Sequence, residues 1–192
     1  MHAGHTNVIV TSDPEEVHRA EALVVPGVGA FRDCRANLDR LHLSSVITEA
    51  MHSGKPYLGI CLGLQILFSV SEEFGASKGL DIFKGRVVSF PPDFSSRRLK
   101  VPHMGWNSVS YSKKPPIMSG IPDESHFYFV HSYYVVPDDK NIISGTSEYG
   151  LRFTSMIWQD NIFATQFHPE KSQTLGLKIL GNFGNLVKGL RI

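Results

Sequence analysis

The pentapeptide GICLG at 59–63 constrains the fold more than any other segment of the chain. It joins an apolar strand, predicted over 57–60, to a helix predicted to begin at Leu62. The pattern is the cysteine counterpart of the G-x-S-x-G elbow, in which a nucleophile sits on a tight turn between strand and helix. Gly59 and Gly63 leave out the side chains that would clash in such a turn. The turn thus predicts a sulfur raised above the carboxyl ends of parallel strands, where open sheets bind ligands.

Cys61 has two interpretations from these residues alone. In the first, a helix N-terminus beneath the sulfur favours thiolate over thiol, and the backbone N–H of Leu62 is free to bind an oxyanion. In the second, Cys61 is a buried structural cysteine, and its small neighbours serve packing.

Strand-like and helix-like runs alternate through the first half of the chain. Strands are predicted at 7–11, 22–25 and 57–60, and helices from Ser12, over 30–43 and from Ser44 or Ser45 to Gly54. This order implies a parallel sheet covered on both faces. The second half has strand-like runs between turns, which favours antiparallel additions to the sheet, at 86–90, 107–111, 127–136, 142–146, 153–158 and 162–167. With a last helix predicted over 172–188 and no linker, residues 1–192 are interpreted as a single α/β domain.

Composition excludes several classes of protein. The chain has 192 residues, 42% hydrophobic and 19% charged, with a formal net charge of +1. This balance is typical of a globular protein and predicts no partnership with nucleic acid or an anionic membrane. No run approaches the roughly 18 apolar residues of a membrane-spanning helix. None of the nine histidines has a metal-ligand spacing such as H-E-x-x-H, so no metal site is expected.

Cysteine usage and the start of the chain indicate the compartment. Only Cys34 and Cys61 are present, too few for a disulfide-stapled module or a four-cysteine zinc site. The first residues lack the basic and apolar regions of a signal peptide. We therefore expect a cytoplasmic protein with reduced thiols. Cys34 lies on a predicted helix without a glycine elbow and is interpreted as a packing residue.

A candidate base lies near the other end of the chain, in the sequence QFHPE at 166–170. His168 and Glu170 are two residues apart, so in extended backbone their side chains leave the same face. The imidazole is then placed to take the proton of Cys61, while the carboxylate fixes the tautomer and orientation of the ring. A surface His and Glu in a turn is the alternative.

The sequence PGVG at 26–29 follows the second predicted strand. Its glycines permit positive φ and leave backbone N–H groups unobstructed, as a second oxyanion donor requires. Arg32 occupies the third glycine position of G-x-G-x-x-G, which excludes a dinucleotide fingerprint. Tight strand-to-helix turns also use glycine for structural reasons alone.

Together, these three segments resemble the class I, triad-type glutamine amidotransferases. The resemblance is narrower to the glutaminase subunits of imidazole glycerol phosphate synthase, and it extends from about Asn7 to the end of the chain. The segments PHMGWN at 102–107 and VHSYY at 130–134 carry this narrower likeness. The fold it implies is flavodoxin-like: a mixed, mostly parallel sheet flanked by helices. Members normally open with a strand and helix that precede the segment 7–11, so the first strand and helix are expected to be missing here.

The resemblance also implies roles for particular residues. Those for the reaction itself are Cys61 as nucleophile, His168 as base and Glu170 as the partner that orients it. The oxyanion is expected to be held at Gly27, Val28, Gly29 and Leu62, and L-glutamine at Gln65, Ser132 and Tyr133. The interface with the partner subunit and the ammonia route are expected near Met104, Gly105, Trp106 and Asn107.

The implied activity is hydrolysis of L-glutamine to glutamate and ammonia, without metal or organic cofactor. The ammonia is expected to pass to a barrel-shaped cyclase subunit in histidine biosynthesis, in a heterodimer. Two alternatives stay open: a glutaminase subunit that serves a different acceptor, and a truncated, non-catalytic binding subunit.

Overall fold

The computed structural model describes residues 8–96 and 99–189. Its helices are α1 (Pro14–Arg19), α2 (Phe31–Arg40), α3 (Leu43–His52), α4 (Leu62–Gln65) and α5 (Gln173–Val187). Its strands are β1 (Leu23–Gly27), β2 (Tyr57–Cys61), β3 (Phe68–Ser71), β4 (Ser77–Lys78), β5 (Phe83–Ser89), β6 (His103–Tyr111), β7 (Ser125–His131), β8 (Tyr133–Pro137), β9 (Ile143–Glu148), β10 (Arg152–Gln159) and β11 (Ile162–Thr165). Short 3₁₀ helices lie at Pro92–Ser95, Pro116–Met118, Lys140–Ile142 and Pro169–Lys171.

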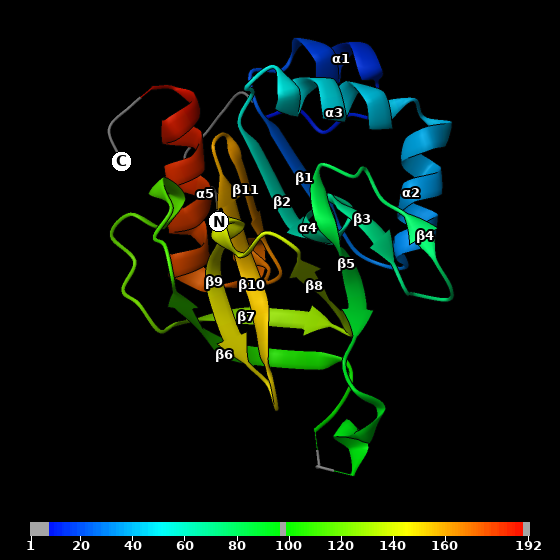
Figure 1. The fold of residues 1–192 in the computed structure, drawn as a ribbon. Coiled ribbons are helices and arrows are strands. Elements are labelled where there is room, and N and C mark those ends of the chain that lie inside the picture. The colour runs from blue at the N-terminus through cyan, green and yellow to red at the C-terminus, as the bar shows by residue number, and fades with distance from the viewer. Residues whose placement is uncertain (1–7, 97–98, 190–192) are drawn as a thin grey trace.

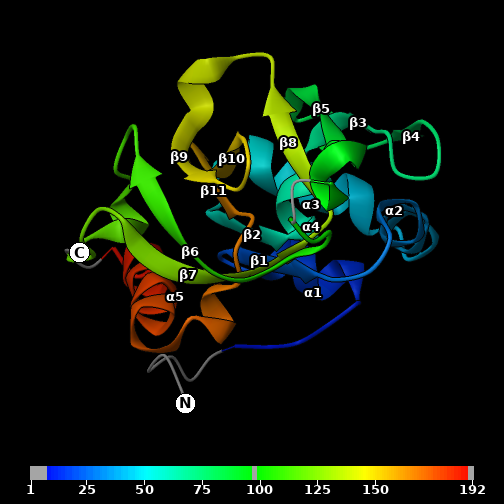
Figure 2. The same cartoon turned by 90° about the horizontal axis from the view of Figure 1, so that it is seen from below.

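The strands form a mixed sheet in the order β1-β2-β11-β10-β8-β5-β3-β4. Strand β9 pairs with β10 and with β6, and β6 pairs with β7. The ribbon of β6 and β7 runs across the lower end of the sheet, at a steep angle to β9, β10 and β11 (Figure 1). Seen from below, the two strands lie side by side along that edge (Figure 2). The expected mixed α/β fold is therefore confirmed.

The expectation of a mostly parallel sheet is wrong. Among the described strands, parallel pairing is limited to β1–β2, β2–β11 and β3–β5. The other pairs, such as β10–β11 and β5–β8, are antiparallel. Most of the second half of the chain connects its strands through short turns rather than crossover helices, and such connections give antiparallel neighbours.

Helices cover the sheet on both faces. Helices α1, α2 and α3 lie together over one face, and α5 lies on the other, where it packs against β11 (Figure 1). Strand β2 is buried at every position because it lies between the two layers. The first core joins Tyr57, Ile157 and Ala164 of the sheet to Leu43, Ile47 and Met51 of α3. The second joins Leu58, Ile60 and Phe163 to Ile179 and Phe183 of α5.

Several local expectations need correction. Residues 8–11 are not a strand, and Val8, Ile9 and Val10 are exposed. In the described part of the chain β1 is an edge strand that pairs with β2 alone, and the segment 8–11 does not pair with it. Asn7 and the residues before it lie outside the described part of the chain. The run predicted as one strand over 127–136 is two strands, interrupted at Ser132.

Two helices also differ from prediction. Helix α3 begins at Leu43 after His42 in a left-handed conformation, so neither Ser44 nor Ser45 caps it. Helix α4 is a single turn that ends at Gln65, because the apolar residues after it enter strand β3. By contrast, the predicted start of α1 is confirmed: the Asp13 side chain accepts a hydrogen bond from the Glu15 N–H. Within the described residues no helix is both long and apolar enough to span a membrane.

Candidate active site

The turn at Cys61 has the strained geometry expected of an elbow. Cys61 has φ 54° and ψ −103°, a conformation that L residues rarely adopt. A Cβ on Gly59 would lie 2.4 Å from the Gly63 carbonyl oxygen, and a Cβ on Gly63 would lie 1.9 Å from the Val25 carbonyl oxygen. Both glycines are thus required by close approach of backbone, as the sequence predicted. Strain of this kind persists only where the surrounding structure holds it, and it concentrates at functional sites.

The Gly63→Ala substitution should destabilise the protein by at least about 3 kcal/mol, because the new Cβ meets backbone of β1 that cannot move without breaking the β1–β2 ladder. Urea denaturation measures the change. The matched control is Gly54→Ala, where a Cβ meets nothing within 4 Å and only the positive φ opposes it. Equal losses of stability in the two variants would contradict the steric explanation.

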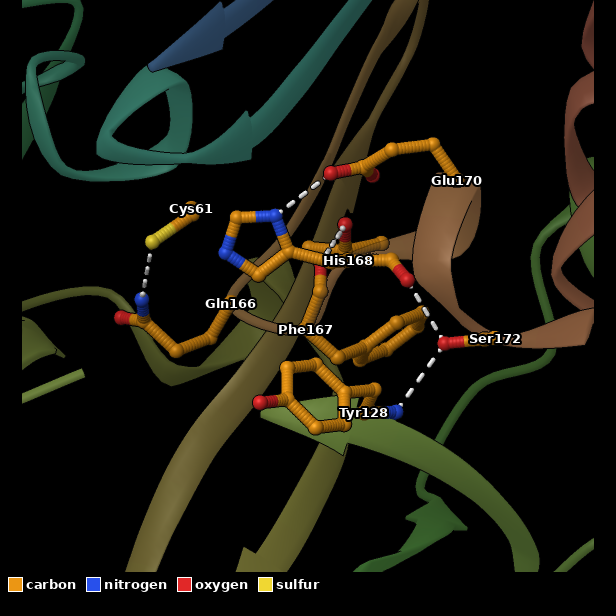
Figure 3. Close-up of polar contacts among 8 residues, drawn as sticks. Cys61, Tyr128, Gln166, Phe167, His168, Glu170 and Ser172 are labelled. Atoms are coloured by element: carbon orange, nitrogen blue, oxygen red, sulfur yellow. Dashed lines mark hydrogen bonds and ion pairs between the residues drawn. The ribbon is translucent and has the colours of Figure 1, made fainter. Parts of the chain in front are cut away.

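His168 and Glu170 form a close pair beside this turn. His168 Nδ1 lies 2.7 Å from Glu170 Oε1, with the His168 side chain 2% exposed and that of Glu170 42% exposed. The other ring nitrogen, Nε2, is buried. In the described structure no atom meets the distance and angle requirements for a hydrogen bond with it. The ring lies between Cys61 and Glu170, with its second nitrogen towards the sulfur (Figure 3). The fold therefore brings Cys61 to a His–Glu pair that lies more than one hundred residues later in the sequence.

The backbone of His168 is fixed to strand β7. Its N–H donates to the Tyr128 carbonyl oxygen at 2.9 Å. Its carbonyl oxygen accepts from Ser172 Oγ at 2.6 Å, and that hydroxyl oxygen accepts from the Tyr128 N–H at 3.0 Å. Figure 3 shows Ser172 bridging the two segments. These bonds leave the imidazole little freedom to move away from Cys61.

Electrostatics favours a charged His168 ring. Burial alone lowers its pKa, but interactions with Cys61 and with the Glu170 carboxylate outweigh burial and raise the pKa to about 9. Burial likewise raises the pKa of Glu170, and the bond to His168 outweighs it, so that this pKa is lowered. The pair is thus an imidazolium beside a carboxylate at neutral pH.

The predicted oxyanion residues come from the end of β1, from the turn that follows it and from the start of α4. In the β1–β2 register Gly27 is opposite Cys61. Val28 is exposed, and Gly29 has φ 96°, a conformation that favours glycine. Leu62 begins α4, where the first N–H groups have no intrahelical acceptor. The positions fit the expected role, and the role itself stays a prediction.

The residues predicted to bind L-glutamine come from α4 and from the junction of β7 and β8. Gln65 is buried, and its Nε2 donates to the Tyr133 carbonyl oxygen at 3.0 Å. Ser132 separates β7 from β8, and its carbonyl oxygen accepts from the Phe90 N–H at 3.1 Å. Tyr133 has a raised pKa, caused first by burial and then by the charge of Glu73. Gln65 thus contacts the backbone of the segment that contains Ser132 and Tyr133, and the role of the three residues in binding glutamine stays a prediction.

The predicted interface residues lie on β6. Met104 and Trp106 are large apolar residues that are 61% and 47% exposed, respectively. Gly105 lies between them with φ 137°. Asn107 points the other way, and its Nδ2 donates to the Glu148 carbonyl oxygen at 2.8 Å. The ring of Trp106 contacts that of Tyr128 edge-on, which connects this surface to the strand that holds His168.

Sequence reasoning assigned no role to several buried polar residues near the site. Gln166 is fully buried and donates from Nε2 to Cys61 Sγ at 3.5 Å. His103 and His131 are buried and joined by a 3.0 Å contact between ring nitrogens. The carboxylate of Glu73 accepts from the Phe31 N–H at 2.6 Å, at the start of α2. The sequence offered one signal for Gln166: it precedes the candidate base His168 by two residues, near the end of the strand predicted over 162–167.

Burial sets the charge of the two histidines. Burial lowers the pKa of His103 to about 4. Burial is also the largest cause of the lowered pKa of His131, which is about 3. Both rings are therefore neutral at physiological pH. In residues 8–96 and 99–189, no group of three His, Cys, Asp or Glu side chains is arranged to hold a metal ion.

Solved structures share this fold. A crystal structure of a glutamine amidotransferase matches with a TM-score of 0.65 at 15% identity, covering 93% of this chain and 85% of the other. The glutaminase domain of Trypanosoma brucei CTPS with bound acivicin matches with a TM-score of 0.61 at 18% identity, covering 93% and 75%.

Sequence comparison is more specific. The family model of class-I glutamine amidotransferases matches residues 2–185. Imidazole glycerol phosphate synthase subunit HisH of Syntrophotalea carbinolica is 52% identical over 179 residues, 92% of this chain and 87% of the relative. The subunit of the same name from Moorella thermoacetica is 50% identical over 181 residues, which cover 94% of this chain and 84% of the relative. The chain therefore belongs to the class-I glutamine amidotransferase family, in the branch that contains the HisH subunits of imidazole glycerol phosphate synthase.

Proposed function

We propose that this protein is a glutaminase that hydrolyses the side-chain amide of L-glutamine and supplies ammonia to the cyclase subunit of imidazole glycerol phosphate synthase, in histidine biosynthesis. The observation that carries the proposal is the strained Cys61 with the His168–Glu170 pair beside it. The identity of about half of all positions with HisH subunits supports the choice of pathway.

The reaction begins with Cys61. Its thiolate attacks the amide carbon of glutamine, and the carbonyl oxygen becomes an oxyanion. The N–H of Leu62 and one from the segment 26–29 hold that charge, a role supported by the position of Gly27 opposite Cys61 in the β1–β2 register. His168, charged at neutral pH because its pKa is raised to about 9, donates a proton to the departing nitrogen. Ammonia leaves, and a glutamyl thioester on Cys61 remains.

The second half of the reaction clears the thioester. His168, now neutral, takes a proton from water, and the resulting hydroxide attacks the thioester carbon. The carbon–sulfur bond breaks, glutamate leaves, and Cys61 returns to the thiolate beside a protonated ring. Glu170 holds Nδ1 at 2.7 Å throughout, so Nε2 is the nitrogen that exchanges protons.

A partner surface is needed because free ammonia is protonated in water and loses its nucleophilicity. The exposed Met104 and Trp106 form an apolar area of the kind found at interface centres. Trp106 contacts Tyr128, whose backbone binds that of His168. We infer that the cyclase subunit docks here, where its binding is transmitted over a short path to the base.

The test is a glutamate-release assay on the purified chain, alone and with the cyclase subunit, in the presence and absence of the ligand of that subunit. We expect release to rise at least about tenfold when the cyclase and its ligand are both present, because docking on Trp106 favours, through Tyr128, the active position of His168. Release that responds to another acceptor enzyme would favour the alternative glutaminase. No release under any condition would favour a non-catalytic binding subunit.

A further inference from the structure

The sulfur of Cys61 has a hydrogen-bond donor other than the candidate base. Gln166 Nε2 lies 3.5 Å from Cys61 Sγ, within the usual range for a hydrogen bond to sulfur (Figure 3). The Gln166 side chain is fully buried, and its backbone N–H donates to the Ser155 carbonyl oxygen at 2.8 Å, which fixes the residue on the sheet. An amide donor held in this way in a dry site interacts strongly with an anionic acceptor.

A single carbonyl determines which end of the Gln166 amide faces the sulfur. The Tyr133 carbonyl oxygen only accepts hydrogen bonds, so the Gln65 atom 3.0 Å from it is the nitrogen. The same Gln65 nitrogen lies 3.2 Å from the other end of the Gln166 amide, which must therefore be the oxygen Oε1. This leaves Nε2 of Gln166 directed at Cys61 Sγ. The orientation thus follows from connected donors and acceptors.

The same carbonyl receives a second bond, which anchors it. His131 Nδ1 lies 2.9 Å from the Tyr133 oxygen and must carry the proton, so its Nε2 is the acceptor for His103 Nδ1 at 3.0 Å. The His103 Nε2 atom then accepts from Asn107 Nδ2 at 3.4 Å. This pattern requires that the His103 and His131 rings are both neutral. Burial favours the neutral form because it lowers the pKa of each ring. The chain of bonds holds the Tyr133 carbonyl, and with it both glutamine amides, in one arrangement.

Because α4 is short, the Gln166 Nε2–H matters for the charge on Cys61. A helix of one turn has little of the macrodipole that was expected to favour a thiolate at Cys61. His168 Nε2 does not make a hydrogen bond of full geometry to the sulfur in this structure. We propose that Gln166 is a further catalytic residue of the glutaminase reaction, which stabilises the Cys61 thiolate by donating its Nε2–H, with Gln65 and Tyr133 as the residues that position it. This inference rests on the proposed function for its role in the reaction.

The test follows alkylation by iodoacetamide as a function of pH, with peptide mass spectrometry to read Cys61 and Cys34 separately. The Gln166→Met variant removes the donor without adding charge, and Gln166→Glu keeps the shape and an acceptor for Gln65 but also adds a negative charge beside the sulfur. The pH of half-maximal Cys61 alkylation should rise by about one unit in Gln166→Met, a tenfold loss of thiolate at fixed pH, and by more in Gln166→Glu, where charge repulsion adds to the lost donor. Cys34 is the internal reference, and Gln159→Met, at the exposed end of β10, is the matched control.

Two kinds of result would contradict the proposed role of Gln166. An unchanged or lowered pH of half-maximal Cys61 alkylation in a folded Gln166→Met protein would overturn the proposal. If Gln166→Met does not fold, an unchanged or lowered value in Gln166→Glu, which loses the donor and gains a repelling charge, overturns it as well. A shift of the same size in Gln159→Met would also overturn it. The assay needs neither glutamine nor a partner, so a failure of the proposed function, seen as no glutamate release by the wild-type protein, is recorded independently of the alkylation result.

Discussion

The Cys61→Ala variant should release glutamate at least about 10³-fold more slowly than the wild-type protein, under every condition in which the wild type is active. The proposed mechanism depends on a covalent thioester, and Cys61 carries the sulfur that the His168 ring faces (Figure 3). Alanine at this position keeps the strained backbone and removes only the sulfur. Glutamate release with saturating glutamine and the cyclase partner measures the effect.

The matched control is Cys34→Ala, which removes the other cysteine of the chain. Cys34 is half-buried on α2, packs against the first core, and has a pKa raised by burial, as suits a thiol that stays protonated. Its variant should keep full activity. Thermal melts of both variants should stay near the wild type. Residual activity of Cys61→Ala close to that of Cys34→Ala would show that the nucleophile lies elsewhere.

The local geometry of the elbow could be predicted from sequence because it depends on residues adjacent in the chain. Gly59 and Gly63 have no alternative explanation once the strand and the turn are placed, and the close approaches to backbone oxygens agree. The pair of His168 and Glu170 was also predicted from residues near each other in the chain, although the reason given, extended backbone, is wrong: Glu170 lies in the 3₁₀ helix Pro169–Lys171. Their position beside Cys61 came from the resemblance to a family rather than from the pattern of residues.

Features set by distant contacts were not predictable. The length of α4 depends on β5, which offers a parallel partner to β3 and so ends the helix. The segment 8–11 has strand-like residues, but strand formation also needs a neighbour to pair with. The direction of the Gln166 amide is decided by the Tyr133 carbonyl, which precedes it by more than thirty residues. Polar networks of this kind have no periodic signature in sequence.

The Glu170→Gln variant should reduce kcat about 10²-fold or more, because a neutral amide no longer stabilises the charged ring in the steps that transfer a proton. The substitution keeps the size of the side chain, and its amide oxygen is still able to accept from Nδ1. What is lost is the charge, so the pKa of His168 should fall from about 9 towards its ordinary value of 6.5. NMR of the ring protons measures that change directly. The exposed Glu148→Gln, at the end of β9, is a control that should change neither kcat nor the ring.

The same substitution predicts how stability depends on pH. In the folded wild type the pKa of His168 is raised from 6.5 to about 9, so its stabilising contribution is complete below 6.5 and is lost as pH rises through about 9. The lowered pKa of Glu170 gives a contribution that is present above the ordinary value of 4.5 and lost as pH falls through the folded value. The wild type should therefore exceed Glu170→Gln in melting temperature most at about pH 6, and less at about pH 9.5. A difference that grew with rising pH would mean that His168 is neutral in the folded protein, and that the ion pair between ring and carboxylate is not what orients the base.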